Sequence, residues 1–165
     1  MTSPQSKVVS APRFYIDVGG APVASFQEMS SLVSEVDAQE YIFCDTAGVV
    51  THTKQYGKTK PPEVTLKRGF DDNAYLWTWH MRVRVNDPSA PVDATLYVVQ
   101  SKPGATDPSQ VETVMSFNLY NAWPKKLEVS GLKAGDSAVA VQSVVLVCDQ
   151  IEFMPKGSSV SLAGA

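Results

Sequence analysis

Residues 112–120 read ETVMSFNLY, and this stretch decides the fold class. Its side chains alternate in character: Met115, Phe117 and Leu119 face one way, and Ser116, Asn118 and Tyr120 face the other. A period of two is typical of a β-strand that packs one face on a core and leaves the other face wet. Antiparallel sheets commonly carry this pattern, so the stretch predicts an antiparallel sheet with one solvated face.

Strand signals extend from this stretch in both directions. Residues 13–18 (RFYIDV) are β-branched and aromatic and end at a Gly-Gly turn, and residues 64–67 and 95–99 also read as strands. Residues 139–147 form a β-branched run that is apolar on both faces near its end, as expected of a strand buried on both sides or bent by a bulge. The sequence therefore predicts a mainly β protein, and its long strands fit a barrel or a sandwich.

One helix is predicted, over roughly Asp72–Val85. Asp71, Asp72 and Asn73 supply an N-cap and favourable negative charge at its start, and Asn-Asp-Pro at 86–88 ends it. Apolar residues at helical spacing form two groups: Ala74, Trp77, Met81 and Val85 on one side, and Leu76, Trp79 and Val83 on the other. So wide an apolar surface predicts a helix that is covered on two sides.

A polar segment, residues 45–62, predicts an extended loop or a long, partly solvated hairpin arm. This segment and the residues just after it carry five basic side chains: Lys54, Lys58, Lys60, Lys67 and Arg68. Glu63 is the only local acidic residue that opposes them. Tyr56 is the sole aromatic residue among them, which gives poor support for nucleic-acid binding. A solvated arm and a surface that meets acidic groups of a neighbouring protein both fit, and Glu35, Asp37 and Glu40 would serve as such groups.

Length and charge narrow the possible classes. The 165 residues, 44% of them hydrophobic, predict one domain over 1–165 with loose termini at 1–10 and 157–165. Fourteen basic and seventeen acidic residues leave a net charge of −3, which argues against bulk binding to nucleic acid or membrane surfaces. No apolar run reaches the ~18 to 20 residues that span a bilayer, and the polar first ten residues show no signal peptide.

The reactive residue types do not form a recognisable site. His80 lies in the predicted helix, where a packed histidine is expected, and His52 has no acidic partner at fixed spacing. No nucleophile, zinc-binding, nucleotide-binding or phosphate-loop motif occurs, so no enzyme activity, cofactor or metal is predicted. Cys44 and Cys148 lie in apolar runs and are predicted to be free buried thiols, with a disulfide between them left open.

Three segments together resemble the tail-tube family of contractile phages and phage-derived injection systems. Residues 12–41 (PRFYIDVGG…ASFQEMSSLVSEVDAQEY) are similar to the family's opening strand, turn and long strand. Residues 54–79 (KQYGKTKPPEVTLKRGFDDNAYLWTW) look like its K-x-x-G loop, T-L-K-R-G strand and Leu-Trp helix. NAWPK at 121–125 is the most specific signal, and the resemblance covers most of residues 12–153 in the right order.

The resemblance implies a single antiparallel β-barrel with a flanking helix. It also implies a structural subunit whose six copies form a ring, the rings stacking into the inner tube of a contractile injection system around a channel that carries payload. A tube-initiator ring between baseplate hub and tube is the alternative within the same machine. A monomeric β-barrel ligand-binding module is the alternative from another class, but it would have no reason for NAWP or the lysine-rich arm.

The resemblance also implies partners and contact residues. The expected partners are further copies of the chain, a sheath protein, a baseplate hub or spike, tube-terminating proteins and effector cargo, with nucleic acid only if the machine is a phage tail. Assembly is expected in the bacterial cytoplasm, into a phage-tail-like particle. Candidates for subunit packing are Trp77, Met81, Asn121, Trp123 and Pro124, and candidates for stacking between rings are Lys54, Lys58, Lys60, Glu35, Asp37 and Glu40. Since Trp123 resumes the parity of Leu119, its ring is predicted to point into apolar packing, and Pro124 is predicted to fix the turn out of the strand.

Overall fold

The computed structural model describes residues 12–102, 106, 111–131, 133, 135 and 139–156. The termini predicted to be loose, 1–10 and 157–165, lie outside these residues. The elements are β1 (Arg13–Val18), β2 (Ala21–Phe26), β3 (Glu28–Cys44), β4 (Val50–Gly69), α1 (Tyr75–Arg84), β5 (Val92–Ser101), β6 (Val111–Ser130), β7 (Val141–Val147) and β8 (Gln150–Pro155).

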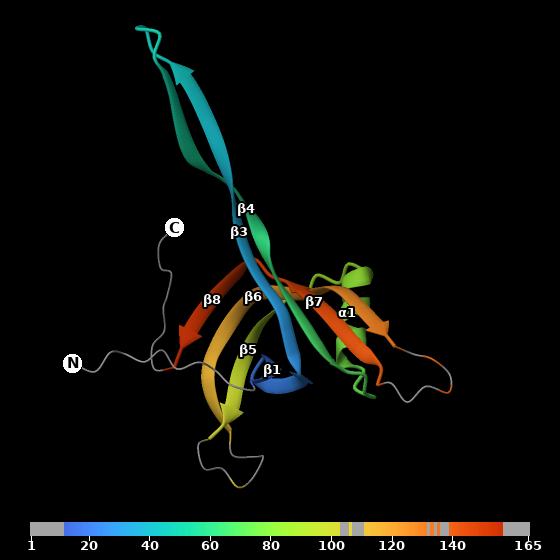
Figure 1. Cartoon of the computed structure of the whole chain (residues 1–165). Coiled ribbons are helices and arrows are strands. Elements are labelled where there is room, and N and C mark those ends of the chain that lie inside the picture. The colour runs from blue at the N-terminus through green and yellow to red at the C-terminus, as the bar shows by residue number, and fades with distance from the viewer. Residues whose placement is uncertain are drawn as a thin grey trace, which may run out of the picture.

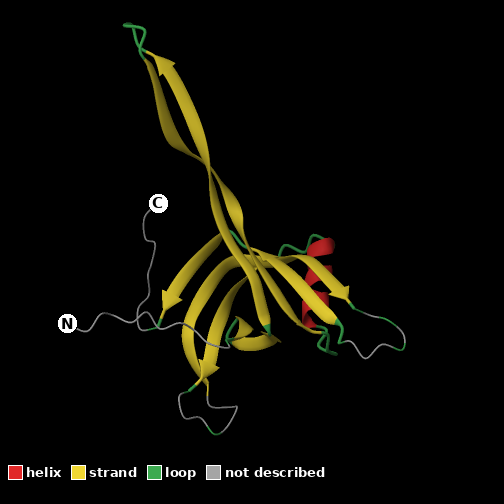
Figure 2. Cartoon of the chain, viewed as in Figure 1, coloured by secondary structure: helices red, strands yellow, loops and turns green. Residues whose placement is uncertain are grey.

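The strands pair antiparallel into one curved sheet (Figures 1 and 2). Their order is β2-β1-β5-β6-β7-β4-β3, and β8 pairs with β6. Strand β6 is shared, because its first part pairs with β5 and β8 and its last part with β7. We call β2, β1, β5, the first part of β6, and β8 sheet A, and the last part of β6, β7, β4 and β3 sheet B. The predicted mainly antiparallel fold with one helix is confirmed for the described residues.

The barrel that the sequence predicts is rolled up but not closed. The two edges of the sheet are β2 and β3, and within the described residues no ladder joins them. The backbone N–H of Gln27, between β2 and β3, donates to the carbonyl of Lys67 at 2.9 Å and ties the two ends together at one corner. Strand β2 leads through Gln27 into β3, and it is β3 that pairs with β4.

The core fills the curve of the sheet and the space under α1. Its fully buried apolar side chains come from both sheets and the helix: Ile16, Leu96, Leu119, Val64, Leu66, Val144, Leu146, Leu76 and Trp79. The indole N–H of Trp79 donates to the carbonyl of Ala90 at 2.7 Å, so this large side chain is buried with its polar atom satisfied. Of the two apolar groups predicted on the helix, the Leu76–Trp79 side is the one that packs on the sheet.

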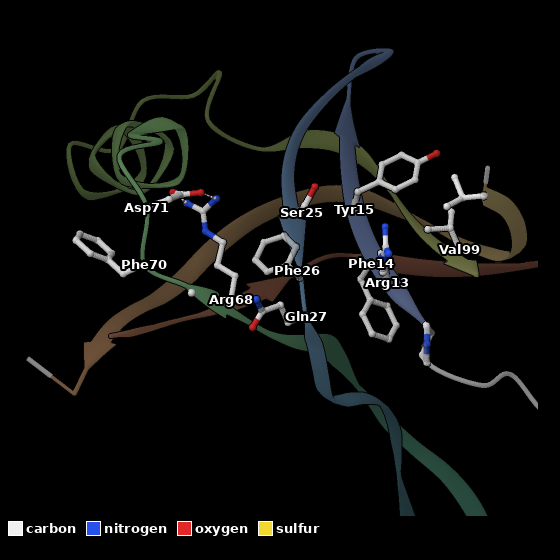
Figure 3. A pocket seen from close by; sticks show the side chains of 13 residues that line it. Arg13, Phe14, Tyr15, Ser25, Phe26, Gln27, Arg68, Phe70, Asp71 and Val99 are labelled. Atoms are coloured by element: carbon white, nitrogen blue, oxygen red, sulfur yellow. Dashed lines mark hydrogen bonds and ion pairs between the residues drawn. The ribbon is translucent and has the colours of Figure 1, made fainter. Parts of the chain in front are cut away.

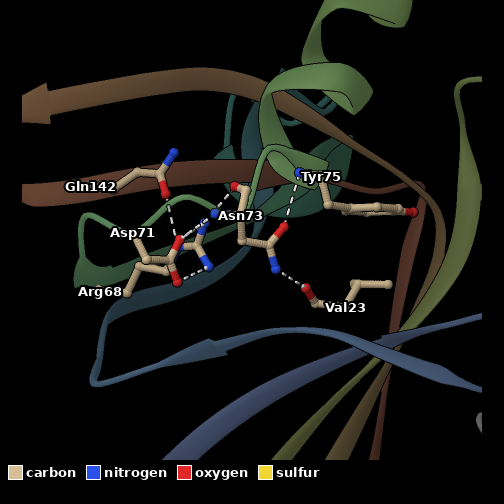
Figure 4. Close-up of polar contacts among 6 residues, drawn as sticks. All are labelled: Val23, Arg68, Asp71, Asn73, Tyr75 and Gln142. Carbon is tan, nitrogen blue, oxygen red and sulfur yellow. Dashed lines mark hydrogen bonds and ion pairs between the residues drawn. The ribbon is translucent and has the colours of Figure 1, made fainter.

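Helix α1 begins at Tyr75, three residues later than predicted, and no acidic residue lies in its first turn. Asn73 does act near the start, since its side-chain oxygen accepts from the Tyr75 N–H at 3.0 Å and its amide nitrogen donates to the carbonyl of Val23. Asp71 is drawn instead toward Arg68, with which it forms an ion pair at 3.1 Å (Figure 4). The prediction that the aspartates cap the helix is therefore wrong, because the helix begins at Tyr75 and no acidic residue lies in its first turn.

Arg68 joins sheet, turn and helix through one buried side chain. It is only 4% exposed, and its Nε donates to Oε1 of Gln142 at 2.8 Å (Figure 4). Its guanidinium also donates to the carbonyl of Asn73 and lies 6.0 Å from the ring centre of Phe26. A buried arginine needs such partners for its donors, and together they hold the turn that leads into α1.

Helix α1 ends at a turn built around Asp87. Asn86 has a φ of 56°, the left-handed conformation that commonly ends helices. The Asp87 carboxylate accepts from the Ser89 hydroxyl at 2.7 Å, from Nε of Arg82 at 2.9 Å and from the Ser89 N–H at 2.9 Å. The Ser89 hydroxyl, then Arg82, then the Ser89 N–H lower the pKa of Asp87 from 3.8 to about 2.

Replacing this carboxylate is expected to make stability less dependent on acid pH. The depressed pKa of Asp87 means that its contribution to the free energy of unfolding is fully present above pH 3.8 and is lost as the pH falls towards 2. Asp87→Asn should therefore be less stable than the parent at neutral pH, and the difference should shrink between pH 4 and pH 2. Urea unfolding at a series of pH values measures this, and a difference that stays constant down to pH 2 would contradict it.

Strand β6 bends at Asn121, whose φ of 51° breaks the alternation. The buried Ala122 follows the buried Leu119 by three positions, where a regular strand would give two, and Pro124 is the next buried side chain. Trp123 thus lies on the opposite face and is only half-buried. The predicted parity of Trp123 with Leu119 is therefore wrong, because the extra residue at Asn121 shifts the side chains from Ala122 to Pro124 to the other face, until a second register shift between Pro124 and Lys126.

The arm is a β-hairpin, the second of the two predicted alternatives. Strands β3 and β4 pair from Glu28 and Lys67 at the base to Cys44 and Val50 at the tip. Only residues 63–69 of β4 also pair with β7, so the outer part stands clear of the body as a two-stranded ribbon (Figures 1 and 2). The predicted boundary of 45–62 is too narrow, since the opposite strand, β3, belongs to the same projection. At Gly57 the strands approach so closely that a Cβ would lie 2.7 Å from the carbonyl oxygen of Asp37.

Candidate assembly surfaces

Helix α1 leaves one apolar side uncovered. Met81 and Val85 are 45% and 74% exposed, whereas Leu76 and Trp79 on the opposite side are buried. Trp77 is half-buried on the exposed side. We call Trp77, Met81 and Val85 the apolar helix face. An apolar stripe on a helix normally packs against another element, so this face is suited to contact with a second chain.

In the NAWP segment, Asn121 and Pro124 bond within the protomer, and Trp123 lies at its surface. The Asn121 backbone N–H donates to Asp93 at 3.0 Å, and its side-chain amide donates to Asp149 at 2.8 Å. The carbonyl of Pro124 accepts from Nδ1 of His80 at 2.9 Å. Asn121 and Pro124 thus hold the bend of β6 to its neighbours. Trp123 lines a shallow hollow of about 350 Å³ with residues at and beyond the end of α1, among them Val83, Pro88 and Pro91.

One face of sheet A carries polar and tyrosine side chains in register. Asp17, Thr95, Asn118 and Glu152 are neighbours in one row across β1, β5, β6 and β8, and Tyr15, Tyr97, Ser116 and Met154 form the next row. We call these two rows, with Tyr120, the polar face. The alternation predicted for residues 112–120 is confirmed by it, because Met115, Phe117 and Leu119 lie on the opposite face against the core.

Side chains on the polar face bond to each other across the strands. The amide of Asn118 lies between Thr95 and Glu152, at 3.1 and 3.3 Å, and the rings of Tyr15 and Tyr97 stack at 4.8 Å. The Tyr120 hydroxyl donates to Glu152 at 2.7 Å, which is the main reason that the pKa of Tyr120 is raised. These bonds keep the polar face ordered while it remains partly accessible to water.

The charged residues predicted for stacking lie on the arm, where several pair with one another. Nζ of Lys60 lies 2.7 Å from Glu35 and 3.1 Å from Asp37, and these contacts raise the pKa of Lys60, the bond to Glu35 most strongly. Glu40 lies 3.0 Å from Nδ1 of His52. Lys54 and Lys58 have no ion pair with another residue that the structure describes. The predicted acidic partners are thus engaged mainly within the hairpin.

The tip of the arm is apolar, which the sequence analysis missed. Tyr41, Ile42 and Phe43 on β3 are 57%, 56% and 42% exposed, and Val49 and Val50 across the turn are both 56% exposed. The rings of Tyr41 and Phe43 lie 5.9 Å apart on one side of the ribbon, and Ile42 points to the other. We call these five residues the apolar tip. The unbroken run YIF at the end of a polar strand was the signal for it.

Reactive side chains are not gathered anywhere in the described residues. No group of three histidine, cysteine or carboxylate side chains there could hold a metal ion. Cys44 and Cys148 are free, so the disulfide alternative is not realised, and Cys44 is exposed, contrary to the prediction. Burial raises the pKa of the Cys148 thiol to about 11. Among the described helices, none is long and apolar enough to cross a membrane.

This β-sheet protein leaves two surfaces uncovered, the apolar helix face and the projecting arm, and both are suited to contacts between subunits. Its fold is similar to that of a chain in the sheath–tube complex of the extracellular contractile injection system PVC, with 21% identity, coverage of 94% of this chain and 99% of that one, and a TM-score of 0.61. It is also similar to a chain of the PVC sheath/tube terminator, with 24% identity, coverage of 91% of this chain and 99% of that one, and a TM-score of 0.63. A third similar structure is a chain of the anti-feeding prophage baseplate, with 16% identity, coverage of 96% of this chain and 100% of that one, and a TM-score of 0.63. The comparison with curated proteins gives no match.

Family membership rests on a separate match. Residues 10–152 match the family described as T4-like virus tail tube protein gp19. The chain therefore belongs to this family of tail tube proteins and is a structural subunit of a tube. The resemblance seen in the sequence is confirmed.

Proposed function

We propose that six copies of this chain join side by side into a ring and that the rings stack into the inner tube of a contractile injection system. The observation that carries the proposal is the apolar helix face, which a single protomer leaves open. Head-to-tail contacts between identical subunits close into a ring when the rotation between copies allows it. The baseplate structure with a similar fold is six-fold symmetrised, which supports the number six.

The polar face of sheet A lines the channel of this tube. It is the broad surface of the body that is both wet and ordered by bonds between side chains, as in the pair Tyr120 and Glu152. The hollow beside Trp123 and the apolar helix face lie away from it, on the α1 side, where neighbouring copies meet. Payload passes along the channel without being chemically changed, and the chain is not an enzyme.

The arm joins successive rings. The outer part of the ribbon is paired only with itself, and a two-stranded ribbon alone is marginally stable in water, so contact with another copy supports it. Lys54 and Lys58 guide the approach of one ring to acidic groups of the next. Glu35, Asp37 and Glu40 belong to the same charge pattern, although Lys60 and His52 already pair with them in the protomer.

Other parts of the machine complete the assembly. A sheath protein surrounds the tube, a baseplate hub or spike starts it, and a terminator closes it, as the solved complexes with a similar fold suggest by their composition. The particle assembles in the bacterial cytoplasm and acts as a phage tail or as a released injection device. Effector cargo fills the channel in the second case and nucleic acid in the first.

Multi-angle light scattering of the purified chain, with electron microscopy of the same samples, tests the ring. The expected mass is six times the 17.9 kDa of one chain, with particles that show a central opening. A monomeric ligand-binding module would give the mass of one chain at every concentration, with no rings or tubes on the grids, and that result would refute the proposal.

Shortening the arm is expected to separate stacking from ring formation. Val36 and Thr59 pair across the hairpin, so residues 37–58 can be replaced by Asn-Gly, a sequence that favours a two-residue turn. The variant keeps the pair of Lys60 with Glu35 and the whole body. It should form rings of unchanged mass that no longer stack into tubes, as judged on grids. Tubes as long as those of the parent would contradict a stacking role for the arm.

A further inference from the structure

The base of the arm is held by the body on several sides. The backbone N–H of Gln27, just before β3, donates to the carbonyl of Lys67 at 2.9 Å. The side chains of Gln27, Phe26 and the buried Arg68 line a cavity of about 700 Å³ beside this contact (Figure 3). Residues 63–69 of β4 also pair with β7. The residues of β4 just outside this base therefore decide the direction in which the arm leaves the body.

The first irregularity outside the base is a β-bulge at Pro61 and Pro62. The ladder of β3 with β4 shifts there, so that these two residues face the single residue Ser34. Pro62 is buried, and its carbonyl accepts the backbone N–H of Cys148 at 3.1 Å. Because proline fixes its own φ and has no N–H to give to a ladder, this bulge is stiff as well as anchored.

A second β-bulge follows on the same strand at Gly57 and Lys58, which together face Asp37. The backbones of Gly57 and Asp37 approach so closely that any Cβ on residue 57 would lie 2.7 Å from the Asp37 carbonyl oxygen. A bulge bends its strand and increases the local right-handed twist. Two bulges on one strand therefore turn the ribbon, and in Figure 1 β3 and β4 change sides between the base and the tip.

Lys60 lies between the two bulges and contacts the opposite strand at two points. Its Nζ lies 2.7 Å from Glu35, its partner in the ladder, and 3.1 Å from Asp37, which faces the outer bulge. One cation thus holds the carboxylates before and within the bend. All three side chains are about half exposed, so dissolved salt can screen these contacts.

We infer that residues 57–62 of β4, with Glu35 and Asp37 of β3, form a joint that fixes the direction of the outer arm before any partner binds. We call this group the arm joint. The bulges set the turn of the ribbon, and the ion pairs of Lys60 hold it. A two-stranded ribbon alone is marginally stable in water, and without the joint its outer part would take many directions. An arm that is already ordered loses less entropy in a later contact. The inference concerns the single chain and does not depend on the proposed tube.

Double electron–electron resonance measures the direction of the arm. One spin label is placed on the native Cys44, exposed at the tip, and the other on Thr78→Cys, exposed on α1. Cys148 stays unlabelled, because it is buried and the pKa of its thiol is raised to about 11. Labelled chains are diluted with unlabelled ones and kept in fractions free of stacked rings, so that every distance lies within one chain.

The parent should give one narrow distribution of distances, and loss of the ion pairs should widen and shift it. The outer arm runs eight residues beyond Val36, so a change of about 20° at the joint moves the tip by roughly 9 Å at about 3.3 Å per residue. Lys60→Gln should show such a change, and Lys60→Arg should not. Salt at 1 M, where the Debye length has fallen to ~3 Å, should act on the parent as Lys60→Gln does and should have no further effect on that variant. Gly57→Ala should widen the distribution more, because the two backbones must separate.

Lys54→Gln is the matched control, because it removes the same charge from the same strand outside the arm joint. Lys54 has no ion pair with another residue that the structure describes, so the distribution should stay as in the parent. Equal widening by Lys54→Gln would show a general effect of charge and would overturn the inference. A distribution that is already broad in the parent would overturn it as well. So would a narrow one that Lys60→Gln, Gly57→Ala and salt all leave unchanged.

Discussion

Met81→Glu is expected to abolish ring formation while leaving the protomer folded. Met81 is 45% exposed at the middle of the apolar helix face, so a carboxylate there stays solvated in the free chain. In a ring the same carboxylate would be buried against a neighbour without a partner, which typically costs ~3 to 5 kcal/mol. Since 1.4 kcal/mol is a factor of ten in an equilibrium constant, association should weaken more than a hundredfold.

Thr78→Glu is the matched control for this variant. Thr78 is exposed on the same helix, between the apolar helix face and the side that packs on the sheet, so the change adds the same charge at the edge of that face and not at its middle. Light scattering should find the Thr78→Glu variant in rings and the Met81→Glu variant as monomers, with similar circular dichroism and melting temperature for both. Rings of equal stability from both variants would mean that the apolar helix face is not the contact between subunits.

Trp79→Ala is expected to give the largest loss of protomer stability. The side chain is 2% exposed between α1 and the sheet, and its indole N–H bonds to Ala90. Truncating a buried tryptophan typically costs ~3 to 5 kcal/mol, because it removes apolar burial and leaves a cavity. For a protein of this size each kcal/mol lowers the melting temperature by about 2 to 4 °C, so a fall of roughly 6 to 20 °C is expected.

Val85→Ala is the control for the truncation, because Val85 is 74% exposed on the other side of the helix. It should change the free energy of unfolding by less than about 0.5 kcal/mol, as exposed substitutions usually do. Urea unfolding of both variants, combined with Met81→Glu to keep every sample monomeric, measures the protomer alone. Similar losses for Trp79→Ala and Val85→Ala would contradict the assignment of the buried and exposed sides of α1.

Local pattern was enough to predict most of the architecture. The alternation of residues 112–120 identified an antiparallel sheet and the side chains that form its polar face, because strand geometry alone sets which residues share a face. The two apolar groups on the helix were separated correctly by their spacing, since a helix places residues three and four apart on one side. Family resemblance then supplied the kind of assembly, which no pattern within one chain can indicate.

Contacts that the pattern of residue types does not show account for the errors. Asp71 was predicted to cap the helix, but it pairs with the buried Arg68, three residues earlier. The helix therefore begins later, at Tyr75. Trp123 read as a core residue because parity was counted through Asn121, whose left-handed φ follows from its place between Asp93 and Asp149. The ion pairs of Lys60 with Glu35 and Asp37 depend on the register of a 17-residue strand, which sequence alone does not fix.

The central claim is that copies of this chain build a tube whose channel is walled by the polar face of sheet A. A cryo-electron microscopy reconstruction of tubes grown from the purified chain tests it most directly. The expected map has six subunits in each ring, with Tyr15, Tyr97, Asn118 and Glu152 facing the channel and Trp77 and Met81 covered by the adjacent subunit. A map with these polar residues on the outside of the tube, or with the apolar helix face exposed to solvent, would contradict the account.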